Sequence, residues 1–546
     1  MSEEKERSPN TSAAHQALVK RFGRFFGATM ISRILGYVRD ASVAYVFGGE
    51  AVTDSFYTAF RISNLLRRLF GEGALGSSFI PVFSKSLKNE SKEETQKFLN
   101  ALFSSLVVIL LILTALGVIF APALTRIVAP GFEAHPEKFQ MTVTLTRLTF
   151  PFFFFICLAA LLSGVLNSLK HFFLPAIAPA MLSIAEIAYL IALIPILLNV
   201  AGQMSKDHLL VGLALSVVVG GAGHLFVQLP ALYKERFSLK FTWNWNHPHS
   251  GQVVKLMIPA MIGLSVDQIN AFVDTICATF LTHGSVTALY NSNRLMQLPL
   301  ALFGIAVASV SLPTLSDQSS SRDYKKFEET IQHSLRLIVF TVLPASLGLI
   351  LLSKPIVALL FEHGQFGSYA TNLTARALEG YCIGLVAYSS VKVLANAFYA
   401  LHEPKMAVRI AVYSMLFNIF LNILLMKPFG VQGLALATSI ASWANAIALY
   451  VMLRKRLHSQ QSTAKRTEEE HKLKLTIIKT LIASAGMGGY IWALFHMAPV
   501  MAPHWQVVLG VGGGLMIFLT IAILLRMDEQ RQIFEMVGLP TDFLDV

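Results

Sequence analysis

The sequence predicts an all-α polytopic membrane protein with fourteen transmembrane helices. Three observations lead to this fold class: 54% of the residues are hydrophobic, only 14% are charged, and long apolar stretches recur along almost the whole chain. An ordinary soluble domain carries roughly 25% charged residues. A helix of about 20 apolar residues is long enough to cross ~30 Å of hydrocarbon. We therefore expect the chain to cross a membrane many times.

Hydropathy and helix-breaking residues place the spans in order. Their expected cores are residues 26–47, 53–83, 100–122, 141–168, 173–199, 208–233, 253–281, 286–314, 332–352, 370–400, 405–426, 431–453, 474–497 and 504–526. Short turns without Lys or Arg follow the first, seventh and thirteenth spans. Basic loops follow the second, fourth, sixth, eighth, tenth and twelfth. Spans two, eight and ten are long and partly polar, which suggests tilting or the lining of a cavity.

The loop charges fix the orientation of these spans. Lys and Arg concentrate in the loops on one side, for example in the run Arg454-Lys455-Arg456, and this bias marks the cytoplasmic side. Both termini are then cytoplasmic. The N-terminal segment has no apolar core with a cleavage site, so we expect the first span to act as the insertion signal. The net charge of +12 reflects these loops and does not indicate nucleic-acid binding.

A weak internal repeat, at an offset of roughly 230 residues, suggests two lobes of six helices. Stretches beginning at Gly48 and Gly164 parallel others beginning at His283 and Ala395. An even number of helices per repeat relates the lobes by an axis along the membrane normal, with a substrate site expected between them. The expected parts are a cytoplasmic N-terminal segment (1–25), an N-lobe (26–235), a C-lobe (250–456), a cytoplasmic linker (457–473), helices thirteen and fourteen (474–526) and a cytoplasmic tail (527–546).

Charged residues within the first, second and eighth spans are the most informative feature. A central arginine costs roughly 2.5–3.5 kcal/mol even on a lenient insertion scale, so we expect these side chains to face water or a partner. Arginines outnumber acids, and a guanidinium binds phosphate oxygens in pairs, which favours an anionic ligand in a hydrated central cavity. The alternative is a set of ion pairs that lock the bundle. The residues are Arg33, Arg39, Asp40, Asp54, Arg61, Arg67, Arg68, Glu72 and Arg294.

A second polar group lies in the C-terminal half. Asp267, Asn270 and Asp274 recur on one face of the seventh span, Asn418 and Asn422 lie one turn apart, and Thr438 follows in the twelfth span. Oxygen ligands of this kind suit a hard cation. The alternative is hydrogen bonding between helices, which is common for Asn and Thr in membranes.

The sequence contains no motif that indicates an enzyme. It has no Walker loop, no GxSxG and no HExxH, and its histidines are scattered. Cys157, Cys277 and Cys382 lack the spacing of a zinc site or a disulfide framework. We therefore expect a transporter without a cofactor, apart from a possible hard cation.

Several stretches together resemble the MurJ (MviN) family of lipid II flippases, in the multidrug/oligosaccharidyl-lipid/polysaccharide exporter (MOP) superfamily. The resemblance extends over about residues 20–530. Its most specific element is NLLRRLFGEGA from Asn64, and it also includes SRILGYVRDASVAYVFG, AVTDSFYTAF, APGF at 129–132 and SVTALYNSNRLMQLP.

The resemblance implies two six-helix lobes around a cationic cavity, with a groove for the lipid tail on helices thirteen and fourteen. The implied substrate is undecaprenyl-pyrophosphate-linked disaccharide-pentapeptide, exported by alternating access. Arg39, Asp40 and Arg294 would meet the pyrophosphate, Asp54 and Glu72 would act in gating, and the remaining head-group residues would be Ser32, Arg33, Asn64 and Arg67. A sodium site would use Asp274, Asn418, Asn422 and Thr438. Membrane lipids and the wall-synthesis machinery are further expected partners.

Two positions depart from some relatives, which have an acid where this chain has Asn422 or Gln297, so the coupling ion stays open. Three other functions are weighed. A flippase for another polyprenyl-linked glycan, of the O-antigen type, would share the charge pattern. A cation-coupled drug exporter would favour acidic and aromatic cavity residues, and a scaffold would need no intramembrane arginine.

Overall fold

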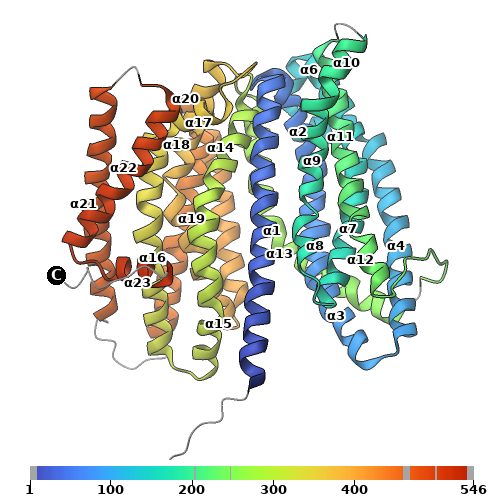
Figure 1. Cartoon of the computed structure of the whole chain (residues 1–546), viewed down its shortest axis with the longest axis horizontal. Coiled ribbons are helices and arrows are strands. Elements are labelled where there is room, and N and C mark those ends of the chain that lie inside the picture. Colours follow the sequence, from blue (N-terminus) through green and yellow to red (C-terminus); the bar gives the residue numbers. More distant parts are fainter. Residues whose placement is uncertain (1–8, 202–203, 246, 459–467, 499–500, 538–546) are drawn as a thin grey trace, which may run out of the picture. The chain divides into compact units, whose positions relative to one another are not determined.

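The structure is a computed structural model, and it describes residues 9–201, 204–245, 247–458, 468–498 and 501–537. Within these residues every regular element is a helix (Figure 1), so the predicted all-α fold is confirmed. The chain divides into two compact units. The first contains Met1–Phe47 and Ala51–Ile269, and the second contains Gly48–Glu50 and Asn270–Val546. The lobe boundaries expected from the sequence stay a prediction.

The first unit contains fifteen complete elements and the first part of α13. They are α1 (Pro9–Phe47), α2 (Ala51–Leu66), the π-helix η1 (Arg67–Leu75), α3 (Gly76–Asn89), α4 (Lys92–Ile119), α5 (Ala121–Val128), η2 (Pro130–Ala134), α6 (Pro136–Thr149), α7 (Pro151–Ser168), α8 (Phe173–Ile177), α9 (Ala180–Ala188), the π-helix η3 (Tyr189–Leu193), α10 (Ile194–Ala201), α11 (Lys206–Phe226), α12 (Leu229–Lys234) and α13 (Pro248–Thr279).

The second unit contains the end of α13 and the remaining elements. They are α14 (Ser285–Pro299), the π-helix η4 (Leu300–Ile305), α15 (Ala306–Ser320), α16 (Tyr324–Leu351), α17 (Ser353–Phe361), α18 (Ser368–Cys382), α19 (Leu385–Ala400), α20 (Pro404–His458), α21 (Glu468–Met497), α22 (Pro503–Leu524) and α23 (Asp528–Val537).

Twelve of the fourteen predicted spans each coincide with one helix or with a run of consecutive helices, and the eleventh and twelfth both lie in α20. In the described part of the chain, nine helices are long and apolar enough to cross a membrane, or ten if the bent pair α18–α19 is one span. α20 counts once, although Gly430 (φ 57°, ψ −133°) breaks it between the eleventh and twelfth predicted spans. α1, the run α2–α3 and α13 are outside this set. The protein is polytopic, and the helices are consistent with fourteen spans.

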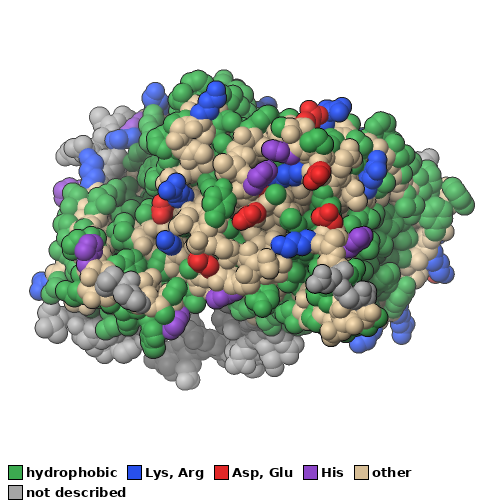
Figure 2. Space-filling view, turned by 90° about the horizontal axis from the view of Figure 1, so that it is seen from above, with side chains coloured by type: hydrophobic (Ala, Val, Ile, Leu, Met, Phe, Trp, Pro, Cys, Tyr) green, Lys and Arg blue, Asp and Glu red, His purple; other side chains and the backbone are tan. Residues whose placement is uncertain are grey.

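The helices present apolar sides, as a lipid environment requires. Large hydrophobic side chains such as Ile112, Val219 and Ile423 are more than half exposed. Figure 2 looks onto one end of the helices, where charged and histidine side chains lie among polar and hydrophobic ones. In a soluble protein, exposed apolar surface on this scale would be an aggregation liability.

In the first unit the core is built around α7, which packs against α3, α4, α11 and η1. Fully buried phenylalanines fill these contacts, and the rings of Phe79 and Phe83 stack with centroids 4.9 Å apart. α1 lies against α8 and α9, and α2 lies against α6. These contacts bring the charged residues of α1 and α2 close to helices that follow much later in the sequence.

In the second unit α19 packs against α15, α16 and α20, and the last two long helices attach at α16 and α17. α21 lies beside α16 and α22, with Phe340, Met487 and Phe518 in the shared apolar core. A buried ion cluster adds to this attachment, because Arg336 of α16 lies 3.1 Å from Glu469 and 3.3 Å from Glu529.

Five helices end in the same way, on a basic residue with positive φ. In each case the N–H of that residue and the N–H of the next bond back to the last turn, which is the Schellman pattern that usually takes glycine. A positive charge at a helix C-terminus interacts favourably with the helix dipole. The residues are Lys170, Arg236, Arg322, His402 and Arg526, with φ between 49° and 65°.

Matching features recur at the spacing of the sequence repeat. The π-helix η1 at Arg67–Leu75 corresponds to η4 at Leu300–Ile305, and each is followed by a helix with an internal proline, Pro81 or Pro313. Because π-helices are rare, their recurrence at equivalent places supports a duplicated six-helix unit.

Candidate functional site

Arg39 lies in a buried carboxylate cluster within the first unit. Its Nη2 is 2.6 Å from Oδ1 of Asp40, and its Nη1 is 3.5 Å from Oε1 of Glu186 on α9. The three residues are 6%, 1% and 2% exposed. A charge this deeply buried needs a partner of opposite sign. Two acids thus contact one guanidinium, and Glu186 is a residue that the sequence analysis missed.

The NLLRRLFGEGA stretch forms the end of α2 and the π-helix η1. Nε of Arg67 donates to Oδ1 of Asn64 at 2.6 Å, and both side chains are half-buried. The structure thus brings together these two proposed head-group residues, which are one helical turn apart. The side chain of Glu72 lies outside the described residues. On α1, Ser32 is half-buried and Arg33 is exposed.

Asp54, proposed for gating, is paired within the first unit. Its Oδ2 lies 2.9 Å from Nζ of Lys138 on α6, and both side chains are more than nine-tenths buried. The ammonium also lies over the ring of Phe132, 4.0 Å from the centroid. The pair therefore fixes α2 against α6, a contact that the sequence analysis did not anticipate.

Arg294 belongs to α14 of the second unit and is half-buried. Its proposed association with Arg39 and Asp40 involves residues of both units and stays a prediction. One turn further along α14, Gln297 donates from Nε2 to Oδ1 of Asn293 at 2.6 Å.

The four residues proposed for a sodium site lie together in the second unit. Nδ2 of Asn422 donates to Oδ1 of Asp274 at 2.7 Å, and Oγ1 of Thr438 donates to Oδ2 of the same carboxylate at 3.2 Å. Nδ2 of Asn418 donates to Oγ1 of Thr438 at 3.3 Å. Asp274 and both asparagines are buried. The break in α20 permits this arrangement, because it folds the two halves of the helix so that residues of both reach one carboxylate.

The donor set fits a monovalent hard cation. It offers one carboxylate, two amide oxygens and a hydroxyl, and Oδ1 of Asn422 is buried with no hydrogen-bond partner among the described residues. In the described part of the chain, no three His, Cys, Asp or Glu side chains gather as a transition metal would require. The side chain of Asp267 lies outside the described residues, and Asn270 is half-buried on α13.

The segment from α12 to α13 is extended and held along α4. Alternate backbone N–H groups donate to side-chain oxygens spaced four residues apart on the helix. Four helical residues rise about 6.0 Å and two extended residues about 6.6 Å, so this ladder stays in register. The bonds run from Ser238 to Gln96 (3.0 Å), from Lys240 to Asn100 (3.1 Å) and from Thr242 to Ser104 (2.8 Å).

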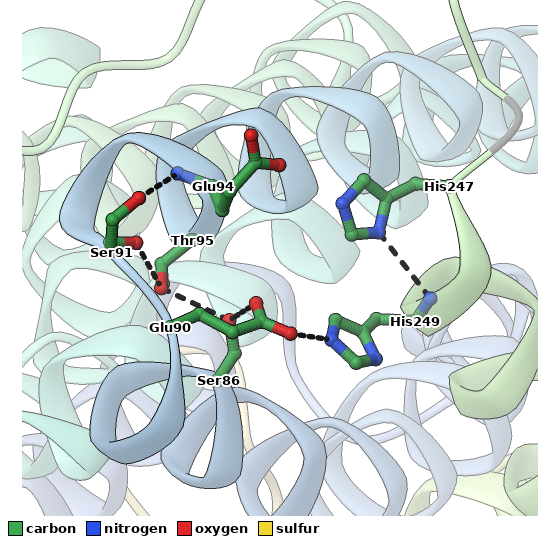
Figure 3. A network of polar contacts seen from close by, with 7 residues as sticks. All are labelled: Ser86, Glu90, Ser91, Glu94, Thr95, His247 and His249. Atoms are coloured by element: carbon green, nitrogen blue, oxygen red, sulfur yellow. Dashed lines mark hydrogen bonds and ion pairs between the residues drawn. The ribbon is translucent and has the colours of Figure 1, made fainter.

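The same segment ends at the turn between α3 and α4 (Figure 3). Nε2 of His249 lies 2.6 Å from Oε1 of Glu90, and the Ser86 hydroxyl donates to Oε2 of Glu90 at 2.7 Å. The hydrogen bonds from His249 and Ser86 lower the pKa of Glu90, because they stabilise the carboxylate. Burial lowers the pKa of His247. The start of α13 is thus held against the turn between α3 and α4.

Many apolar helices, buried ion pairs and a buried cluster of carboxylate, amide and hydroxyl groups are features of a polytopic membrane transporter. Its fold is that of the MOP superfamily: a multidrug resistance MATE family transporter in an inward-facing conformation matches with a TM-score of 0.64 and 16% identity, covering 79% of this chain and 96% of that chain.

A narrower assignment comes from closer relatives. The family model described as lipid II flippase MurJ matches residues 43–511. A probable lipid II flippase MurJ of Rhizobium tropici is 35% identical over 92% of this chain and 90% of its own length. The lipid II flippase MurJ of Burkholderia cenocepacia is 34% identical over 79% of this chain and 82% of its own length. A solved lipid II flippase MurJ in an inward closed conformation has a TM-score of 0.75 and 27% identity, covering 92% of this chain and 99% of that chain. The chain belongs to the MurJ family of lipid II flippases.

Proposed function

We propose that this chain is a lipid II flippase. It moves undecaprenyl-pyrophosphate-linked disaccharide-pentapeptide from the inner to the outer leaflet of the bacterial cytoplasmic membrane, where peptidoglycan synthesis uses it. The family match over residues 43–511 carries the proposal, supported by relatives whose names state this activity. The activity is transport of an intact lipid and involves no chemical conversion.

The physical task is to carry a charged head group through the membrane while the lipid tail stays in hydrocarbon. A bare pyrophosphate in hydrocarbon would lose its hydration without compensation. Buried arginines can replace that hydration with charge-assisted hydrogen bonds. Arg39 is already desolvated and held by Asp40 and Glu186 in the first unit, so we propose that the pyrophosphate exchanges with these carboxylates. Arg294 of the second unit would supply a further contact.

The driving force in this proposal is electrical, ionic or both. An inside-negative potential favours outward movement of negative charge by ~2.3 kcal/mol per charge per 100 mV. If a sodium ion binds, Asp274, Asn418, Asn422 and Thr438 would hold it, and the ion would neutralise the buried carboxylate. Alternating access, gated in part by Asp54 and Glu72, would expose the head-group site to each side in turn.

The proposed location is the bacterial inner membrane, with both termini in the cytoplasm. The basic loops support this orientation, and the five helices that end on a basic residue all end on the side assigned to the cytoplasm. Direct partners would be lipid II and membrane lipids, with the wall-synthesis machinery as a further candidate.

The experiment follows the lipid-linked precursor in cells depleted of the protein. Outward exposure is measured as the fraction of precursor that an added cleaving enzyme can reach. We expect exposure to fall on depletion and to be restored by the wild-type gene. Unchanged exposure during continued precursor synthesis would contradict the proposal and favour a carrier of another polyprenyl-linked glycan or a scaffold.

A further inference from the structure

The first unit contains a cavity whose lining includes none of the proposed head-group residues. It has a volume of about 650 Å³ and lies among α1, η1, α3, α7, α8 and α11. Ligand sites for small molecules typically occupy about 300–1,000 Å³, so the cavity is large enough to hold one. Its polar lining comes from Thr29, Ser77, Ser163, Asn167 and His224.

His224 is the strongest indication that the cavity receives a ligand. The residue is 7% exposed and lines the cavity, where its imidazole can both donate and accept a hydrogen bond. A ligand that covers this ring without bonding to it would lose binding free energy. Gly71 of η1 also lines the cavity, and the same π-helix begins at Arg67, a proposed head-group residue. The cavity therefore adjoins the residues proposed to bind the head group.

The lining chemistry narrows the class of ligand. None of the described residues that line the cavity is charged, which does not suit a phosphate. The Asn167 amide and the His224 imidazole do not suit an alkyl chain, because binding would cover these polar groups without hydrogen bonds. Ile80, Ile156 and Pro179 supply apolar walls between these groups. An uncharged ligand with both hydroxyl or amide edges and apolar faces fits this surface, and an acetamido sugar has those properties.

We propose that this cavity binds the glycan part of the lipid-linked substrate, with His224 and Asn167 as hydrogen-bonding residues. The inference rests on the proposed function and extends it: the arginines hold the pyrophosphate, and the cavity in the first unit recognises the sugars attached to it. The protein would thereby discriminate a glycosylated carrier from the bare carrier that returns without sugars.

Gly76 allows the cavity to be filled without strain. It lines the cavity, and a Cβ built on it meets no atom within 4 Å, so a larger side chain extends into open space. Gly76→Leu is therefore expected to block the cavity while the helix keeps its backbone. Gly251→Leu is the matched control, because Gly251 also lies in a helix of the first unit, has no atom within 4 Å of a Cβ and does not line the cavity. His224→Phe keeps an aromatic ring and removes the two nitrogens that could hydrogen-bond a ligand.

The test compares the Kd of the purified full-length protein for two lipids, undecaprenyl pyrophosphate and undecaprenyl-pyrophosphate-linked disaccharide-pentapeptide. We expect Gly76→Leu and His224→Phe each to weaken binding of the glycosylated lipid by about tenfold or more and to leave binding of the bare lipid within twofold. Gly251→Leu should bind both lipids as the wild type does. The thermal midpoint of each variant checks folding, and His224→Phe keeps the test decisive if Gly76→Leu unfolds.

The possible failures are distinguishable. If the folded variants bind both lipids as the wild type does, or lose both equally, the cavity is not a glycan site although the proposed function stands. If the wild type binds neither lipid, the proposed function fails and the glycan site fails with it.

Discussion

Glu186→Gln tests whether the pyrophosphate of the substrate must displace the Glu186 carboxylate from Arg39 in order to bind. The variant keeps the shape of the side chain and removes its charge, so that Asp40 is the nearest remaining acid to the guanidinium, at 2.6 Å. Two effects follow from the geometry. The folded protein loses one ionic contact, and Arg39 becomes more available to an incoming pyrophosphate.

The separation of 3.5 Å between Arg39 and Glu186 determines the expected size of the energetic effect. At an effective dielectric constant of about 20 this distance corresponds to an attraction of about 5 kcal/mol. Removing one partner of a buried pair typically costs about 3–5 kcal/mol when the other is left alone. Because Arg39 keeps Asp40, we expect a smaller loss in the free energy of unfolding, about 1–3 kcal/mol. Affinity for pyrophosphate should rise by about tenfold, which is 1.4 kcal/mol.

The assay measures the thermal midpoint and the Kd for undecaprenyl pyrophosphate on purified protein. Glu133→Gln is the control, because Glu133 pairs with Arg126 on an exposed surface, where ion pairs contribute little. We expect Glu186→Gln to melt at a lower temperature and bind the lipid more tightly, while the control changes neither property. If Glu186→Gln behaves like Glu133→Gln in both measurements, the reasoning is wrong.

Three further predictions concern other parts of the molecule. If the cation site binds sodium, the wild type should have a higher thermal midpoint in NaCl than in KCl at equal ionic strength, and Asp274→Asn should abolish this difference. A wild type without a sodium effect would contradict the cation site. Lys138→Met should lower the free energy of unfolding by about 3–5 kcal/mol, because it removes the ammonium that lies 2.9 Å from the buried carboxylate of Asp54. The double variant with Asp54→Asn should recover part of that loss, and additive single losses would argue against coupling. The contacts that hold the segment before α13 should weaken in acid. Because the folded protein lowers the pKa of both Glu90 and His247, each group contributes its full stabilisation only above the pKa that it has in the unfolded chain. That stabilisation is lost as the pH falls, from about 6.5 for His247 and at lower pH for Glu90. Hydrogen exchange at residues 238–249, corrected for intrinsic rates, should rise on acidification, and constant protection down to pH 4 would refute this.

Sequence patterns predicted the helices well because hydrocarbon imposes a strong length requirement on each span. The break in α20 at Gly430 falls in the gap expected between the eleventh and twelfth spans. The π-helices were not predicted, since nothing in the composition of LALFGI or RRLFGEGAL distinguishes a wider turn from an α-helix. Their positions depend on packing against neighbouring helices.

Among the polar sites, one grouping was predicted from the sequence and another was not. Asn418 and Asn422 were grouped from helical spacing, and tertiary packing places both with Asp274 and Thr438. The pairing of Arg39 with Glu186 was not predicted, because the partner lies on a helix far along the chain and only the contact of α1 with α9 selects it. Glu186 did carry a signal, since a glutamate inside the apolar stretch of the fifth span must find a partner.

The most direct test of the central claim is transport by the purified protein in lipid vesicles. Lipid II is incorporated, a membrane-impermeant enzyme that cleaves the pyrophosphate linkage is added outside, and the cleaved fraction is followed with wild type, Arg39→Gln or no protein. The account predicts that wild type makes the inward-facing pool accessible, while that pool stays protected in empty vesicles and is released more slowly by Arg39→Gln. Equal protection in vesicles with and without wild-type protein, under an imposed potential and a sodium gradient, would contradict it.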